Sequence, residues 1–88
     1  MMLGKVVGNV VATAKLPILQ GLKIMVVQPI DAVGKPRGQT LLAFDMVQAG
    51  IGDTVLVIDE GNSCRTILGD PQAPIRMLIV GIVDEIEQ

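Results

Sequence analysis

Residues 44–65 constrain the fold more than any other stretch of this chain, because a turn, a strand and a run of small residues follow one another there. Gly50 and Gly52 stand two positions apart, so the backbone can reverse sharply or adopt a positive φ. Residues 54–58 are mostly β-branched and apolar, a composition typical of a strand. Residues 61–65 are small apart from the final arginine, which predicts a loop whose backbone passes close to a neighbouring group.

The rest of the chain repeats this pattern of short β-branched runs separated by glycine, proline and polar residues. Gly4 and Gly8 interrupt the first run and predict a bend or a bulge in a long strand. Glycine and prolines in residues 66–74 limit any helix begun at Ser63 to a short, broken one. The predicted strands cover residues 2–15, 22–27, 39–45, 54–58 and 75–83, with a connection across one end of the fold at 16–21, a polar hairpin loop at 31–38 and an acidic tail at 84–88.

The composition predicts one domain, residues 1–88, that cannot easily stabilise itself. A domain of this size buries only about 60–65% of the surface that its unfolded chain exposes. Half of its residues are apolar, yet the single cysteine excludes an internal disulfide and the absence of histidine removes the commonest metal ligand. We therefore expect self-association to bury the apolar surface that one core cannot.

A membrane is the other way to bury apolar surface, and the sequence argues against it. The charge-free runs at residues 6–14 and 77–83 are far shorter than the roughly 20 residues of a spanning helix. The first residues also lack the apolar segment of a good signal peptide, because Gly8 interrupts them. We expect a soluble, cytoplasmic protein.

Five short strands with glycine-rich corners predict an all-β fold, a small five-stranded OB-like barrel that is antiparallel, partly open and has at most a short helical turn. Curling into a barrel removes the exposed strand edges that a flat sheet would present. The pattern alone leaves the strand order open.

The usual ingredients of catalysis are missing. With no His and no Tyr, acid–base chemistry would fall to carboxylates or lysines, and the acidic residues are mostly single residues at turns, where they cap or are solvated. Cys64 has no general base in the sequence to activate it, so we interpret it as a small packing residue beside Ser63. We expect no enzyme, no catalytic residue, no metal site and no cofactor.

Charge and aromatic content also argue against nucleic acid as a partner. The net charge of −2 gives no long-range attraction to phosphates, and Phe44 is the only aromatic side chain, too few for a base-stacking platform. Arg65 stays open between an ordinary surface residue, a partner of Asp59, Glu60 or an acid of the tail, and a special role.

In their order and spacing, these residues resemble the EutN/CcmL family of bacterial microcompartment vertex proteins across nearly all of the chain. The stretches that carry the resemblance are residues 4–8, 12–15, 19–23, 26–29, 44–47, 49–53, 55–57, 61–65 and 79–84. The resemblance implies a five-stranded barrel that forms a cyclic homo-pentamer without catalytic activity. It also implies a place at the vertices of a polyhedral shell whose facets consist of hexameric shell proteins.

The resemblance further implies two groups of site residues. A candidate subunit interface comprises Asp45, Val47, Gln48, Ala49 and Gly50, and a candidate pore or interface loop comprises Gly61, Asn62, Ser63, Cys64 and Arg65. Three features depart from the family pattern: Gln48 replaces a usual glycine, Asn62 and Cys64 vary a usual Gly-Ser-Ser-Ala-Arg loop, and Arg76 stands where an acid is expected.

Two alternatives remain at this stage. An OB-type module that binds nucleic acid has the same fold class, although fold is weak evidence for function. A non-catalytic regulatory subunit that forms a ring around an enzyme is the other.

Overall fold

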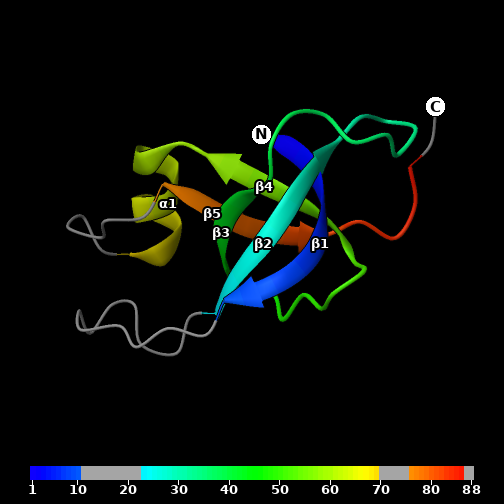
Figure 1. Cartoon of the computed structure of the whole chain (residues 1–88). Coiled ribbons are helices and arrows are strands. Elements are labelled where there is room, and N and C mark those ends of the chain that lie inside the picture. The colour runs from blue at the N-terminus through cyan, green and yellow to red at the C-terminus, as the bar shows by residue number, and fades with distance from the viewer. Residues whose placement is uncertain (11–22, 70–75, 87–88) are drawn as a thin grey trace.

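The computed structural model describes residues 1–10, 23–69 and 76–86, and within α1 it describes the side chains of all residues except Asn62, Ser63 and Arg65. The elements follow the chain as β1 (Met2–Val10), β2 (Lys23–Ile30), β3 (Leu41–Asp45), β4 (Thr54–Asp59), α1 (Gly61–Leu68) and β5 (Met77–Ile82) (Figure 1). Each of the five predicted strands is present. The predictions for residues 11–22, 70–75 and 87–88, including the 16–21 connection, lie outside the described residues.

The strands form a closed barrel in the order β1-β2-β3-β5-β4, so the predicted fold class, a small five-stranded barrel, is confirmed. The prediction that the barrel is partly open was wrong, because β3 and β5 pair and close it. Four of the five pairings are antiparallel, and β3 and β5 run parallel. The prediction of an antiparallel barrel was wrong at this seam, because five strands cannot alternate in direction all the way around a closed ring. The seam is also short, with Phe44 opposite Leu78 and Asp45 opposite Ile79 as its only registered pairs among the described residues.

β-branched residues on alternate strand positions fill the barrel interior. In β4, Val55 and Val57 are fully buried, and in β1 and β2 the partners Val6 and Val27 are as well. The predicted irregularity in β1 is confirmed as a register shift between Val6 and Gly8. The main core consists of Val6, Met25, Val27, Ala43, Ala49, Val55, Val57 and Ile79.

A second, smaller apolar cluster lies between the barrel and α1. Cys64 of α1 and Leu78 of β5 are fully buried in it. Leu68 follows Cys64 by four positions, so both side chains lie on the face of the helix that packs on the barrel. The remaining members are Phe44, Ile58 and Val80.

The prediction of a loop at residues 61–65 was wrong, because these residues form the first part of α1, a continuous helix. Asn and Ser are only moderate helix formers, and tertiary packing of an apolar face decides the outcome here. The end of the helix does follow a readable signal. Gly69 has φ 72° and its N–H donates to the carbonyl of Thr66 (3.2 Å), which is a common way for a helix to terminate.

Gly4 occupies a position in β1 where the barrel leaves no space for a side chain. A Cβ atom there would overlap Cγ1 of Val27 and approach the carbonyl oxygen of Gln28 at 3.3 Å. Val27 is fully buried in the core, so it cannot move away without displacing other core residues.

We expect Gly4→Ala to lower the free energy of unfolding by about 1–3 kcal/mol, the usual cost of overpacking a core. Gly81→Ala is the matched control, because the atom that a Cβ there would approach is the Cβ of Leu56, at an ordinary distance of 3.9 Å. Chemical denaturation of both variants measures the difference. Equal stability of the two would contradict the expectation.

Candidate subunit interface and helix segment

The candidate interface residues form a loop that Asp45 organises. The Asp45 side chain is only 5% exposed, and its carboxylate oxygens accept hydrogen bonds from the N–H groups of Val47 (3.0 Å) and Ala49 (2.8 Å). Hydrogen bonds to an ionised acceptor are stronger than neutral ones. Ala49 is itself part of the barrel core, so the loop is held from inside the barrel as well.

The same loop is tied to β1 at its far end. Gly50 donates its N–H to the carboxylate of Asp53 (2.8 Å), and Asp53 returns its N–H to the Gly50 carbonyl (3.0 Å). Gly52, with φ 97°, makes the reversal that the sequence predicted. The N–H of Gly52 and the carbonyl of Asp53 then bond the backbone of Val6. The loop therefore has a fixed backbone, and we call residues 45–53 the interface loop.

Gln48 adopts a left-handed backbone conformation, with φ 61°. Among the described residues it is the one non-glycine residue with a positive φ. The hydrogen bonds of Asp45 to the residues on both sides of Gln48 hold this conformation in place. A glycine at this position would avoid the steric cost, which gives a physical reason for the glycine that the resemblance implies here and makes Gln48 the less favourable residue.

We expect Gln48→Gly to raise the free energy of unfolding by about 0.5–1 kcal/mol. The left-handed conformation costs a non-glycine residue about 1–2 kcal/mol, and glycine removes this cost. Part of the gain is lost because glycine has a higher conformational entropy in the unfolded chain. Gln48→Ala keeps the steric cost and is expected to change stability little. Thermal and chemical unfolding of the two variants make the comparison. Gln48→Gly no more stable than Gln48→Ala would show that the position is unstrained.

The second candidate group, residues 61–65, begins α1 beside the first residues of the last strand. The carbonyl of Arg76 accepts hydrogen bonds from the N–H of Glu60 (3.0 Å) and from Sγ of Cys64 (3.0 Å). The thiol thus joins the helix to the segment that leads into β5. This arrangement agrees with the interpretation of Cys64 as a packing residue, since its side chain is 0% exposed.

Arg76 and Asp59 form an ion pair on the surface near this helix. Nε of Arg76 lies 2.8 Å from Oδ1 of Asp59, while the Arg76 side chain is 77% exposed, so the pair contributes little to stability. Asp59 is also one of the partners that the sequence offers for Arg65. The side chain of Arg65 lies outside the described residues, so its role stays a prediction.

We expect Cys64→Ala to lower stability by less than about 1.5 kcal/mol and to leave the oligomeric state unchanged, because alanine retains most of the packing and only a weak thiol hydrogen bond is lost. Unfolding curves and native mass spectrometry, each with and without reductant, measure both quantities. An assembly that depends on reductant in the unmodified chain, or that is lost in Cys64→Ala, would assign the thiol a role beyond packing.

The structure does not bring the two candidate groups together. Figure 1 shows α1 on one side of the barrel and the interface loop between β3 and β4 on the other. Within the described residues, no group of three or more His, Cys, Asp or Glu side chains could hold a metal ion. None of the helices in the described part of the chain is long and apolar enough to cross a membrane.

Sequence reasoning missed a set of exposed apolar side chains away from both groups. Leu42 of β3 and Val33 of the 31–38 loop are 55% and 65% exposed, and Ile86 of the tail is also exposed. No sequence signal marks them, because an apolar residue in a strand or a loop is ordinary unless its direction relative to the core is known.

A small barrel with ordered loops, a capping helix and exposed apolar side chains has the character of an assembling structural subunit. The family model for ethanolamine utilisation protein EutN/carboxysome proteins matches residues 1–84. The carboxysome shell vertex protein CcmL of Synechocystis sp. is 40% identical over 86 residues, which cover 98% of this chain and 85% of that protein. The microcompartment shell vertex protein EutN of Salmonella typhimurium is 37% identical over 86 residues, covering 98% and 86%.

A solved structure agrees with these matches. The GrpN pentameric microcompartment shell protein from Rhodospirillum rubrum has 40% sequence identity and a TM-score of 0.85, with 100% of this chain and 99% of that one covered. The chain therefore belongs to the EutN/CcmL family, as its sequence had suggested.

Proposed function

We propose that this protein forms homo-pentamers that occupy the vertices of a bacterial microcompartment shell. The observation that carries the proposal is the full-length similarity, in sequence and in fold, to a pentameric shell protein. The apolar excess of the chain supports it, because a ring buries two different surfaces of every subunit.

The geometry of shells explains what such a pentamer does. A layer of six-fold units is flat and cannot close, whereas five-fold units at the corners introduce the curvature. The partners are accordingly hexameric shell proteins of the facets. The role is structural, with no reaction of its own and no cofactor.

The two candidate groups take parts in this assembly. The interface loop, with Asp45, Val47, Gln48, Ala49 and Gly50, has a backbone fixed by hydrogen bonds, and a fixed edge suits a repeated contact because little entropy is lost on binding. We assign residues 61–65 to the pore or to a second contact, since the start of α1 is anchored to the barrel by the Arg76 carbonyl.

Binding of nucleic acid by this OB-like barrel is disfavoured. Phe44, the only aromatic residue, packs in the cluster under α1, so it does not offer an open stacking surface. The net charge of −2 gives no attraction to phosphates. A regulatory ring subunit would share the oligomeric state, and co-purification with shell hexamers distinguishes it from a vertex protein.

Native mass spectrometry of the purified chain is expected to give roughly 46 kDa, five times the subunit mass of 9.3 kDa.

Deletion of the gene is expected to leave facets that form but shells that stay open, leaky or elongated, with the enclosed enzymes still active. Electron microscopy of the deletion strain tests the vertex role. Normally closed shells that retain their contents, in a strain without a second vertex protein, would refute it.

A further inference from the structure

The turn at residues 47–49 of the interface loop takes its hydrogen bonds from one side chain. Among the described residues, none of its backbone groups bonds another backbone group. The N–H groups of Val47 (3.0 Å) and Ala49 (2.8 Å) donate to the Asp45 carboxylate, one to each oxygen. The following part of the interface loop is instead tied to β1 by backbone bonds. The shape of the turn therefore depends on a single carboxylate.

The same turn contains the strained backbone of Gln48, at φ 61°. A residue with a side chain disfavours this left-handed conformation about tenfold. Val47 and Ala49 pack on the barrel core and anchor both ends of the turn, so a change of conformation is confined to the backbone around Gln48. Gln48 itself is exposed, and no packing of its side chain in the core opposes such a change.

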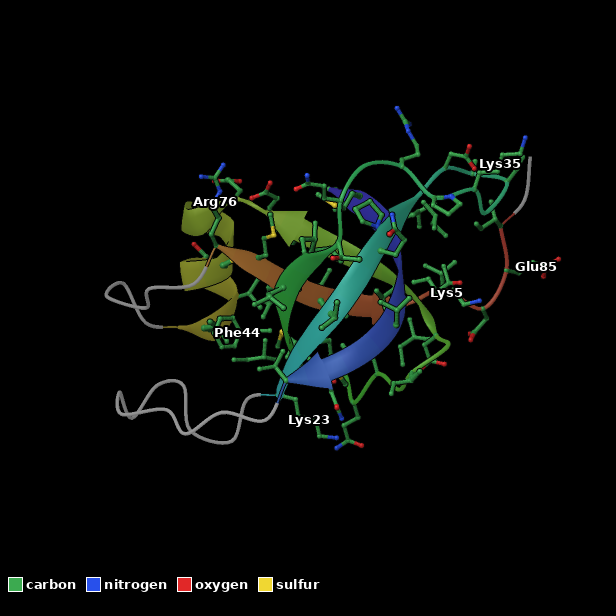
Figure 2. The ribbon with its side chains drawn as sticks, viewed as in Figure 1. Lys5, Lys23, Lys35, Phe44, Arg76 and Glu85 are labelled. Atoms are coloured by element: carbon green, nitrogen blue, oxygen red, sulfur yellow. The ribbon has the colours of Figure 1, made fainter. Side chains whose placement is uncertain are left out.

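The surroundings of the turn leave space for this change. A hollow of about 250 Å³ is lined by Lys23, Asp45, Met46 and Gln48. Lys23 begins β2 and is registered opposite Asp45. Figure 2 shows Lys23 at one end of the barrel, far from Lys35. The carboxylate thus holds the turn beside open space and not against a packed surface.

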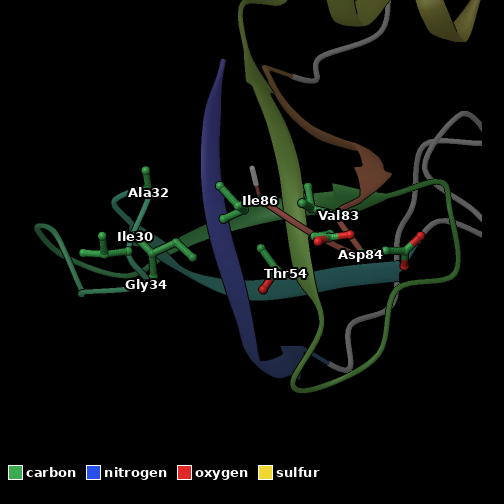
Figure 3. Close-up of a pocket in the computed structure, with 9 residues that line it drawn as sticks. Ile30, Ala32, Gly34, Thr54, Val83, Asp84 and Ile86 are labelled. Carbon is green, nitrogen blue, oxygen red and sulfur yellow. The ribbon is translucent and has the colours of Figure 1, made fainter. Parts of the chain in front are cut away.

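The 31–38 loop provides a comparison within the same chain, because a carboxylate organises it as well. Oδ1 of Asp31 accepts the N–H groups of Val33 (3.0 Å) and Lys35 (2.9 Å). The left-handed residue there is Gly34, at φ 88° (Figure 3). Backbone bonds also join Asp31 to Gly34 (3.0 Å) and to Lys35 (2.9 Å). This loop keeps its shape without strain, whereas the turn at 47–49 does not.

We propose that Asp45 is a conformational latch for the interface loop. Its carboxylate keeps the turn at 47–49 in a held state, with Gln48 left-handed, against a released state in which Gln48 leaves this conformation. The inference rests on the proposed pentamer, in which the held state makes the contact between subunits. The residue at position 48 sets how strongly the ring depends on Asp45, because its strain favours release.

The two residues act on one equilibrium, which gives the latch a measurable signature. While the carboxylate is intact, the held state predominates, so removing the strain at position 48 changes the fraction of held turns little. Once the carboxylate is lost, the released state predominates, and removing the strain raises the held fraction by about the full tenfold. A purely structural role of Asp45 would give residue 48 the same effect in both backgrounds.

The first experiment measures the concentration at which the ring dissociates, by native mass spectrometry and sedimentation over a dilution series. Asp45→Asn is nearly isosteric, but an amide has one oxygen, so its NH₂ group faces one of the two N–H donors. This variant is expected to dissociate at a concentration at least about tenfold higher than the unmodified chain. Adding Gln48→Gly is expected to recover most of this loss.

Two controls accompany these variants. Gln48→Ala, added to Asp45→Asn, removes the side chain but keeps the strain, so it is expected to recover none of the loss. Asp31→Asn makes the same change of carboxylate to amide in a loop whose left-handed residue is glycine. It is expected to leave the dissociation of the ring unchanged.

The second experiment acts on the latch while Asp45 stays intact. Gln48→Val places a β-branched residue, which tolerates a positive φ least, at an exposed position where the fold is retained. Hydrogen exchange is expected to be at least about tenfold faster at the amides of Val47 and Ala49, although their acceptor is still present. The amide of Gly52, which bonds β1, is expected to be unchanged. The ring is expected to dissociate more easily, as in Asp45→Asn.

The outcomes separate this inference from the proposed function. If the unmodified chain is not a pentamer, the proposed function fails, while hydrogen exchange still tests the latch. Unchanged exchange at Ala49 in Gln48→Val would show that the turn has no released state. Faster exchange with unchanged dissociation of the ring would overturn the link to assembly. Equal recovery by glycine and alanine at position 48 would assign the effect to the side chain and overturn the latch. Should Asp45→Asn fail to fold, Gln48→Val alone decides.

Discussion

Closure of the barrel at the seam between β3 and β5 is the constraint on which the rest of the structure depends. An odd number of strands forces one parallel pairing, and this pairing has only two registered pairs in the described chain. Asp45 is one of the four residues in them, and its carboxylate also orders the interface loop. One residue thus connects the shortest pairing of the barrel with the backbone that we assign to assembly. The cluster of Cys64, Leu78 and Phe44 under α1 reinforces the seam from outside.

The fold class and the strands could be predicted because they follow from local patterns. Valine and isoleucine runs such as residues 54–58 favour strands by themselves, and glycines mark the bulge in β1 and the reversal at Gly52. The strand order, the parallel seam and α1 could not be predicted in this way. All three depend on contacts between residues distant in sequence, as when Cys64 packs on Leu78 and stabilises a helix that its own composition does not favour.

The candidate site was only partly readable from sequence for a related reason. Asp45 and Gly50 belong to a stretch with recognisable turn chemistry, and the structure gives them hydrogen bonds that fix the loop. Leu42 and Val33 carry no such signal. An apolar residue in a strand or loop is ordinary until the structure shows that it points away from the core, so their exposure required coordinates.

The strained conformation of Gln48 illustrates how assembly and stability can be separated in this fold. A left-handed glutamine costs free energy, yet the loop keeps its shape because Asp45 binds the backbone on both sides of it. The shape of a repeated contact surface matters more to a ring than the stability of one subunit, since an error in angle is multiplied around the ring. A small barrel that is only moderately stable alone is therefore compatible with a rigid pentamer, provided that its loops are fixed by hydrogen bonds and its exposed apolar side chains are buried by the neighbours.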